Sequence, residues 1–382
     1  MFLVKEQGPT HAPNVSLLVM KTFDIKKQRR FIFLTVMFLS LFGLIMVYES
    51  SSIYAYKISS DPMYFFSRQL SYCAVGVALF IAMLFVDLDF LRRNNKVFLA
   101  ITIILLFAVL IVGKRAGGAR RWFHSPFFNF QPSEMLKITF LVYCAEYCRR
   151  KGNLIRYFRQ GLLPLGLILG VTSLLLLLEP DLGSSIFWVV WTLFFLFLHR
   201  ARKQHIFLIV IFGVVLLFFL ITLYPYRFKR ITAYFNPYAD PRNTGFQIIQ
   251  SQIAFGEGGL WGVGLGEGRQ KLFFLPAAHT DFIFSIIAEE FGLWGSLSLF
   301  ALFFFLINAM VGIAQRSTDE FRRGLLWGII FIFFLEVIIN IGVSCGLFPT
   351  KGLPLPFMSY GGSNLITHFI LLGLFFNASK ET

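Results

Sequence analysis

Ten long apolar runs constrain the fold of this sequence more than any other feature. A helix needs roughly 20 apolar residues to cross the ~30 Å hydrocarbon core of a bilayer. Hydrophobic residues make up 57% of the chain and charged residues only 14%, an apolar surplus that a water-soluble domain cannot bury. The sequence therefore predicts an all-α polytopic integral membrane protein with about ten transmembrane helices, one large and several short extracytoplasmic loops. The predicted spans are 31–49, 70–88, 97–113, 134–148, 161–178, 183–198, 205–223, 281–312, 325–347 and 364–378.

Two of these spans are irregular. The fourth is short and contains Glu134 and Lys137, which weakens its hydropathy signal. The eighth is long, and we expect it to be tilted or broken near Gly292 and Gly295.

The distribution of Lys and Arg orients the chain. With the N-terminus inside, the cytoplasmic segments hold 21 of these cations and the short external segments hold 7. The loop 224–280 is left out because long loops translocate largely regardless of charge. The sequence predicts cytoplasmic tails at 1–30 and 379–382 around a membrane domain at 31–378. The net charge of +15 is then explained by the Lys and Arg residues that orient the chain in the membrane. No motif indicates nucleic acid binding.

The short external loop 114–133 is unusually basic for its side. Four cations in it, including Arg120 and Arg121, precede Trp122. Guanidinium groups bind phosphate well, so the loop indicates an anionic ligand at the outer face. Contacts with lipid headgroups are the alternative.

Glu134 and Lys137 are three residues apart on one helix and can pair. Ionisable groups within a membrane usually face the bundle interior. A structural ion pair and a role in ligand binding both fit this spacing, and Gln131 and Ser133 stand just before it.

The loop 224–280 is rich in glycine and ends immediately before Asp281. Thr280 is a candidate N-cap, which would place Asp281 in the first helical turn. Alternatively, a carboxylate at the membrane boundary can accept a proton from a hydroxyl group. The cations of this loop that could receive a polyanion include Arg230, Arg269 and Lys271.

Further polar residues lie at membrane depth or in the last external segment. The segment 349–363 contains three prolines and ends in glycine, so it predicts an ordered external loop near Asp281. Lys351 and Ser359 lie in it. The residues at membrane depth, which predict a polar cavity, a proton path or buried pairs, are Glu289, Glu290, Glu336 and Asn340.

Several specific motifs follow one another between about residue 30 and residue 378. They are Gly118-Ala119-Arg120-Arg121-Trp122, Phe130-Gln131-Pro132-Ser133-Glu134, Glu179-Pro180-Asp181-Leu182-Gly183, Arg230-Ile231-Thr232-Ala233, Gly258-Gly259-Leu260-Trp261-Gly262-Val263-Gly264-Leu265-Gly266, His279-Thr280-Asp281-Phe282-Ile283-Phe284 and Lys351-Gly352-Leu353-Pro354-Leu355-Pro356-Phe357 with Ser359-Tyr360-Gly361-Gly362-Ser363. In this order and in a ten-span frame, the chain resembles the SEDS family (shape, elongation, division, sporulation) of peptidoglycan polymerases. The resemblance is closer to the division branch than to the elongation branch. Glu179 and Glu336 depart from the family pattern, since many members carry Gln at these positions.

The resemblance implies a glycosyltransferase that polymerises lipid II, an undecaprenyl-diphosphate disaccharide-pentapeptide, at the outer face of the bacterial cytoplasmic membrane. Asp281 matches the essential loop aspartate of the family and is the candidate general base. A class B penicillin-binding protein and other division proteins are the implied partners, at the septum and among membrane lipid. A divalent cation, Mg²⁺ or Mn²⁺, could assist the diphosphate. The candidate substrate and diphosphate ligands are Arg120, Arg121, Trp122, Arg230, Arg269, Lys271 and Lys351, whereas Glu134 and Lys137 are expected to organise the cavity.

Three other classes of function compete with this interpretation. A lipid II flippase would place its essential charges in a central cavity, whereas polymerisation needs them at the outer boundary. A polymerase of another surface polysaccharide would share the topology. A non-catalytic scaffold for division would tolerate Asp281→Ala.

Overall fold

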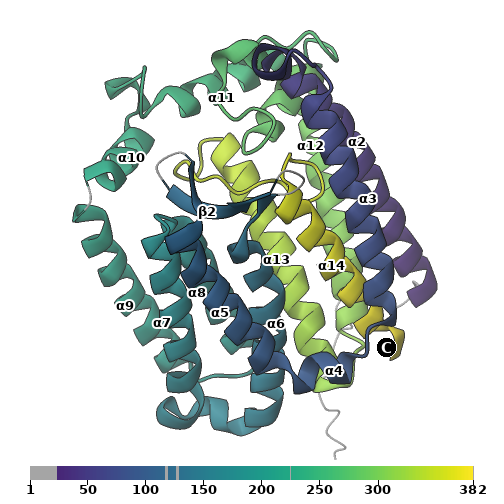
Figure 1. Cartoon of the computed structure of the whole chain (residues 1–382), viewed down its shortest axis with the longest axis vertical. Coiled ribbons are helices and arrows are strands. Elements are labelled where there is room, and N and C mark those ends of the chain that lie inside the picture. Colours follow the sequence, from purple (N-terminus) through teal and green to yellow (C-terminus); the bar gives the residue numbers. More distant parts are fainter. Residues whose placement is uncertain (1–23, 117–118, 126–128, 224, 382) are drawn as a thin grey trace, which may run out of the picture.

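The computed structural model describes residues 24–116, 119–125, 129–223 and 225–381. Long helices run side by side, with the strands, α10 and α11 at one end and α4 with the C-terminus at the other (Figure 1). Each predicted span overlaps one long helix, so the all-α polytopic fold is confirmed. These helices are α2 (Ile25–Ser59), α3 (Tyr64–Phe85), α5 (Asn95–Val112), α6 (Pro132–Lys151), α7 (Leu163–Leu178), α8 (Leu182–Leu198), α9 (Lys203–Thr222), α12 (Ile283–Ala314), α13 (Glu320–Ser344) and α14 (Gly362–Ala378).

Shorter elements build the two ends of the bundle. In the basic loop 114–133, three strands pair antiparallel in the order β1-β2-β3, with Lys114 opposite Trp122. The loop 224–280 contains further helices, of which α11 packs along α12. The short elements are α4 (Leu88–Arg93), β1 (Lys114–Ala116), β2 (Ala119–His124), β3 (Asn129–Phe130), η1 (Gly152–Arg156), η2 (Phe158–Leu162), α10 (Pro225–Phe235), η3 (Pro237–Ala239), α11 (Phe246–Gly258), η4 (Gln270–Phe274) and η5 (Ser379–Glu381).

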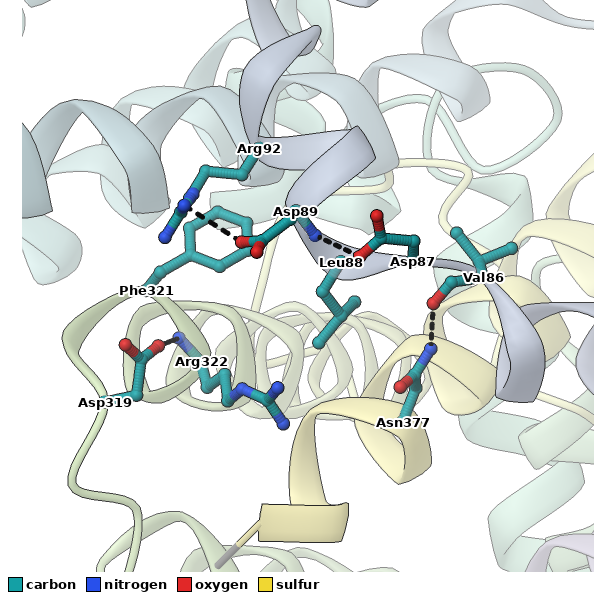
Figure 2. A pocket seen from close by; sticks show the side chains of 9 residues that line it. All are labelled: Val86, Asp87, Leu88, Asp89, Arg92, Asp319, Phe321, Arg322 and Asn377. Carbon is teal, nitrogen blue, oxygen red and sulfur yellow. Dashed lines mark hydrogen bonds and ion pairs between the residues drawn. The ribbon is translucent and has the colours of Figure 1, made fainter.

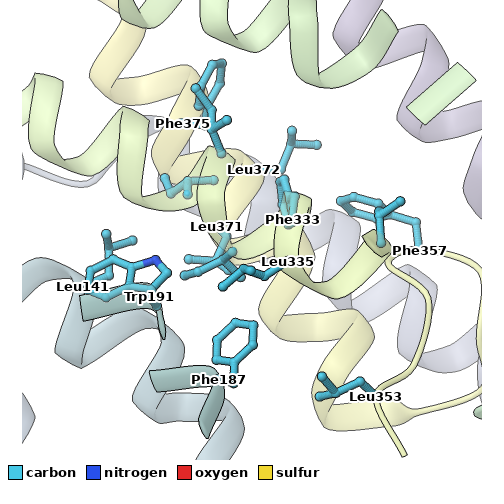
Figure 3. Packing of buried hydrophobic residues seen from close by; sticks show 14 of the residues in the cluster. Leu141, Phe187, Trp191, Phe333, Leu335, Leu353, Phe357, Leu371, Leu372 and Phe375 are labelled. Carbon is cyan, nitrogen blue, oxygen red and sulfur yellow. The ribbon is translucent and has the colours of Figure 1, made fainter. Parts of the chain in front are cut away.

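Helix α6 lies at the centre of the bundle, which explains its weak hydropathy. It contacts α5, α13 and α14, and most of its residues are buried. Because its neighbours are protein rather than lipid, it can carry charged side chains. Leu141 of α6 packs among residues of α8, α13 and α14, such as Trp191 and Leu371 (Figure 3). In contrast, α9 has no buried residue and is apolar on every side, as a lipid-facing helix would be.

Helix α2 extends beyond the predicted span at its N-terminal end. Residues 1–23 lie outside the described residues, and α2 begins at Ile25 after an Asp24 cap. Residues 25–30 of the predicted N-terminal tail are helical, because a helix need not end at the hydrocarbon boundary. Near this end Arg29 donates to the carbonyl of Phe376 in α14 (3.4 Å). The first and last long helices thus begin and end on the same side, as an even number of spans requires.

Helix α12 is broken at Gly292, one of the two positions predicted from the sequence. Gly292 has φ +66°, and the backbone around it is unwound. The loop after α11 compensates this break: Val263 N–H donates to Glu289 O and Leu293 N–H donates to Gly259 O, at 3.0 and 2.9 Å. Irregular backbone is tolerated at membrane depth where protein satisfies its polar groups.

Replacing Gly292 by alanine is expected to destabilise the protein by about 2 kcal/mol or more. A Cβ at this position would lie 2.3 Å from the backbone nitrogen of Gly262, in addition to the cost of a positive φ. Gly170→Ala in α7 is the matched control, since nothing lies within 4 Å of its Cβ position. Thermal unfolding in detergent should show a lower Tm for Gly292→Ala only; equal Tm values would contradict the prediction.

Candidate active site

Asp281 lies in a tight turn just before α12. The backbone N–H groups of Thr280, Asp281 and Phe282 all donate to the carbonyl of Ala277, and the Thr280 hydroxyl donates to it as well (3.1 Å). The N-cap of α12 is Phe282, which forms no side-chain capping bond. The expectation that Thr280 caps the helix is therefore wrong, because its hydroxyl is used within the turn.

One amide side chain joins the Asp281 turn to the segment 345–361, which follows α13. Asn340 Nδ2 donates to the carbonyl of Asp281 (2.9 Å) and to that of Leu353 (2.7 Å). The backbone of Gly352 passes so close that a Cβ there would lie 2.5 Å from Asp281 Oδ2. The predicted proximity of this loop to Asp281 is confirmed.

Two cations, Lys351 and Arg121, act on the Asp281 carboxylate. Burial raises the pKa of Asp281 to about 6, and the two positive charges limit that rise. Burial lowers the pKa of Lys351 to about 8, against the opposing charge of Asp181. Lys351 Nζ is buried, and it has no hydrogen-bond partner in the described part of the chain. Such an ammonium can donate to an oxyanion that enters the site.

Arg121 on β2 is held by the turn between α7 and α8. Its Nε donates to the carbonyl of Glu179 (3.0 Å), and its Nη2 donates to that of the following proline (2.6 Å). Asp181 caps α8 by accepting from the backbone and hydroxyl of Ser184, at 3.0 and 2.7 Å. Burial acts to raise the pKa of Asp181, but Lys351, Arg121 and Ser184 together hold it below its usual value. Arg121, Asp181, Lys351 and Asp281 therefore form one charged group at the end of the bundle.

A buried ion network adjoins this group. Lys137 Nζ pairs with Glu134 (2.7 Å) and with Glu336 of α13 (2.5 Å). Glu336 also contacts Nε2 of His368 in α14 (2.6 Å), and Asn364 Nδ2 donates to Glu134 (3.2 Å). The Glu134–Lys137 pair predicted from their spacing is confirmed, and it has become part of a network across three helices.

Hydroxyl and amide groups fix the outer ends of α6 and α14. Gln131 N–H donates to the Ser363 hydroxyl (3.1 Å), and its side-chain amide donates to Ser133 (2.9 Å). Ser359 Oγ accepts from the N–H of Leu355 (2.8 Å). These predicted polar residues hold the backbone that surrounds the charged group.

The predicted ligand Lys271 lies in a separate, structural cluster. Its ammonium pairs with Glu290 (2.7 Å) and Glu49 (3.2 Å). Glu289 accepts from the backbone N–H of Arg269 (2.6 Å). Glu289 and Glu290 thus anchor the η4 loop to α12 and α2.

The remaining cations predicted to bind the substrate are Arg120, Arg230 and Arg269. Arg120 donates to two carbonyls in the last turn of α5, at 3.1 and 2.9 Å. Arg230 and Arg269 are exposed, and no described contact joins them to Asp281. Trp122 is half-buried on β2, next to Arg121.

Three residues near the site, Glu179, Asp181 and His368, have no role predicted from the sequence. Glu179 is fully buried, and neither of its carboxylate oxygens has a hydrogen-bond partner among the described residues. Burial raises its pKa to about 8. The Glu-Pro-Asp motif was the available signal for Glu179 and Asp181. No pattern in the sequence singles out His368, because its partner Glu336 lies 32 positions earlier.

A polar cavity of about 480 Å³ lies at the opposite end of the bundle. Asp87 and Asp319 in it cap α4 and α13, and Asp89 pairs with Arg92 (3.0 Å). Figure 2 shows the Asp89–Arg92 pair, with Asp87 and Asp319 accepting from the backbone N–H groups of Asp89 and Arg322. The cavity contains none of the predicted site residues.

Fold and site together define a polytopic membrane protein with a carboxylate and two cations clustered at one end of its helices. Residues 29–382 match the cell cycle protein family FtsW/RodA/SpoVE, and the chain belongs to this family.

Relatives and solved structures agree with this assignment. The chain is 41% identical to a probable peptidoglycan glycosyltransferase FtsW of Geobacter metallireducens, over 94% of this chain and 96% of that protein. It is 38% identical to stage V sporulation protein E of Bacillus subtilis, over 91% and 96%. A chain from a peptidoglycan synthase complex has a TM-score of 0.76 at 28% identity, over 94% and 98%. Thermus thermophilus RodA has a TM-score of 0.68 at 25% identity, over 94% and 98%.

Replacing Lys137 by methionine is expected to destabilise the protein by about 3–5 kcal/mol, because two buried carboxylates lose their cation. Adding Glu336→Gln to this variant should restore part of the lost stability, because it removes one of the two uncompensated charges. The exposed Lys96→Met is the control. An unchanged Tm in detergent for Lys137→Met would show that the network contributes nothing.

Replacing Glu179 by glutamine is expected to weaken the pH dependence of stability. The pKa of this carboxyl is about 8 in the folded protein, against an ordinary value of 4.5. Between these values only the folded state holds the proton, so stability falls as pH rises through this window and then levels off. Glutamine has no such proton to lose. Thermal unfolding across this window should give a flatter Tm profile for the variant, and parallel profiles would contradict the raised pKa.

Proposed function

We propose that this chain is a peptidoglycan glycosyltransferase that polymerises lipid II into glycan strands at the outer face of the cytoplasmic membrane, during septal wall synthesis. The observation that carries the proposal is the placement of Asp281 beside Lys351 and Arg121 in a member of this family. Relatives named peptidoglycan glycosyltransferase FtsW match almost their full length, which supports both the activity and the division role.

Asp281 acts as the general base in this proposal. A sugar hydroxyl of the acceptor attacks the anomeric carbon of the donor, and its proton passes to the Asp281 carboxylate. The bond between that carbon and the diphosphate oxygen breaks, and the lipid diphosphate leaves. With a pKa of about 6, Asp281 is largely ionised at neutral pH and still basic enough to accept a proton.

Lys351 and Arg121 stabilise the leaving diphosphate in the same proposal. Charge develops on the diphosphate oxygens as the bond breaks, and preorganised cations lower the energy of that state. Lys351 has free hydrogen-bonding capacity, whereas Arg121 is oriented by two carbonyls. Because Lys351 loses its charge above about pH 8, the activity should be highest between the pKa values of Asp281 and Lys351.

A divalent cation, Mg²⁺ or Mn²⁺, is the cofactor that we propose. Mg²⁺ is commonly held by one or two carboxylates, with waters and substrate phosphates completing its shell. Asp181 lies within electrostatic reach of Lys351 and would be the carboxylate that holds the ion, which leaves Asp281 free to act as the base. No cluster of three metal-ligating side chains occurs in the described ranges. The ion would neutralise charge on the diphosphate.

We further propose a class B penicillin-binding protein as partner, within the division machinery, and cytoplasmic termini. The resemblance to a chain from a peptidoglycan synthase complex supports the partner. The excess of Lys and Arg in the predicted cytoplasmic segments supports the orientation. The contact between Arg29 and Phe376 supports placing both termini on one side.

Replacing Asp281 by asparagine is expected to reduce polymerisation about 100-fold or more, with an unchanged Tm. The measurement is strand formation from labelled lipid II by purified protein with Mg²⁺ or Mn²⁺, each with and without the penicillin-binding partner. Near-native turnover by Asp281→Asn would exclude the general base. If the wild type forms no strands but moves lipid II across vesicle membranes, the protein is a flippase instead.

A further inference from the structure

An aromatic cluster adjoins the Asp281 turn at the outer end of α2 and α3, and the proposed mechanism does not use it. His279, two residues before Asp281, lies at its centre. The ring of His279 lies 4.7 Å from that of Phe65 and 5.8 Å from that of Tyr54, between centroids. Tyr360 packs edge-on against Phe65 at 5.0 Å and donates its backbone N–H to the carbonyl of His279 (2.9 Å).

The outer rim of this cluster is exposed. Tyr54 is 40% exposed and Phe273 is 47% exposed, and their rings meet at 6.2 Å. Lys57 Nζ lies 4.6 Å from the centroid of Phe273, and Arg68 Cζ lies 4.6 Å from that of Tyr64. We call these five residues the aromatic platform. It presents ring faces with two cations beside them.

Backbone strain holds one ring of the platform in place. Phe273 has φ +71°, a conformation that a non-glycine residue rarely adopts without compensation. Strain of this kind collects at functional sites, where the surroundings impose it. Here the ion pairs of Lys271 with Glu49 and Glu290 fix the same η4 segment.

The platform lies beyond the hydrocarbon rather than within it. Helix α2 has 35 residues and is about 52 Å long at 1.5 Å per residue, against a hydrocarbon thickness of about 30 Å. The predicted span ends at residue 49, where Glu49 forms an ion pair with Lys271. Tyr54 is five residues further along, about 7.5 Å beyond that point. This position is at the outer edge of the headgroup region, which extends about 5–7.5 Å beyond the hydrocarbon on each side.

We propose that the aromatic platform is a binding site for the glycan strand, namely pyranose rings that carry acidic substituents. The C–H groups on one face of a pyranose are slightly positive and pack against the negative face of an aromatic ring. Lys57 and Arg68 are placed to meet carboxylates on the substituents. Because His279 connects the platform to Asp281, a bound strand would lie next to the proposed base. This inference rests on the proposed polymerase function and adds to it a site that holds the strand between additions.

The test combines strand length with direct binding. Tyr54→Ala and Phe273→Ala are compared with the wild type, and Tyr54→Phe keeps the ring while removing the hydroxyl. Trp261→Ala is the matched control, since Trp261 is 80% exposed and packs on Trp294 instead. The two readouts are the length of strands made from lipid II and the Kd of the purified protein for a hexamer of N-acetylglucosamine.

We expect each alanine variant on the platform to shorten the strands and to weaken hexamer binding about fivefold. Tyr54→Phe and Trp261→Ala should behave like the wild type, and Tm values exclude misfolding. Unchanged strand length and Kd in both alanine variants would overturn the proposal. So would shortening seen only with the penicillin-binding partner present, which would make the platform a protein-docking surface. If the wild type forms no strands, the proposed function fails, and hexamer binding alone then decides whether a saccharide site exists.

Discussion

The ammonium group of Lys137 is the charge on which the rest of the structure depends. It lies within the bundle, where an uncompensated charge is very costly. Glu134 on its own helix and Glu336 on α13 compensate it, and His368 extends the contact to α14. A charge that must be neutralised from several sides fixes the distance and rotation of three helices. The apolar contacts around Trp191 and Leu371 then pack around this arrangement.

The proposed active site follows from the ends of these fixed helices. Asn340 on α13 holds two loop carbonyls at once, so the Asp281 turn and the Lys351 loop cannot move independently. The turn before α8 supplies Asp181 and orients Arg121. Burial moves the pKa of Asp281 up and that of Lys351 down. A carboxylate and a cation are thereby kept close together at one end of the bundle.

A second set of constraints attaches the loop 224–280 to the helix bundle. The break at Gly292 exposes backbone groups, several of which bond the segment after α11. Lys271 and its two carboxylates attach η4 to α2 and α12. The strained Phe273 lies in this attached η4 segment, and Glu49 stands before the last turns of α2. These two segments place aromatic rings beside the turn that contains Asp281.

The sequence by itself determined the all-α polytopic fold, the break at Gly292 and the pairing of Glu134 with Lys137. It could do so because length, apolar content, glycine and i,i+3 spacing act through neighbouring residues. It also singled out Asp281, by a resemblance in motif. Only the tertiary structure decided that Thr280 does not cap α12, that Lys271 forms structural ion pairs, and that the charge of Arg121 rather than that of Arg120 acts on Asp281. The interactions of Lys271 and Arg121, like the contact of Glu336 with His368, depend on residues far apart in the chain, whereas the Thr280 hydroxyl bonds within its own turn. Which cation meets which carboxylate is set by how the helices pack, and a local pattern does not contain that information.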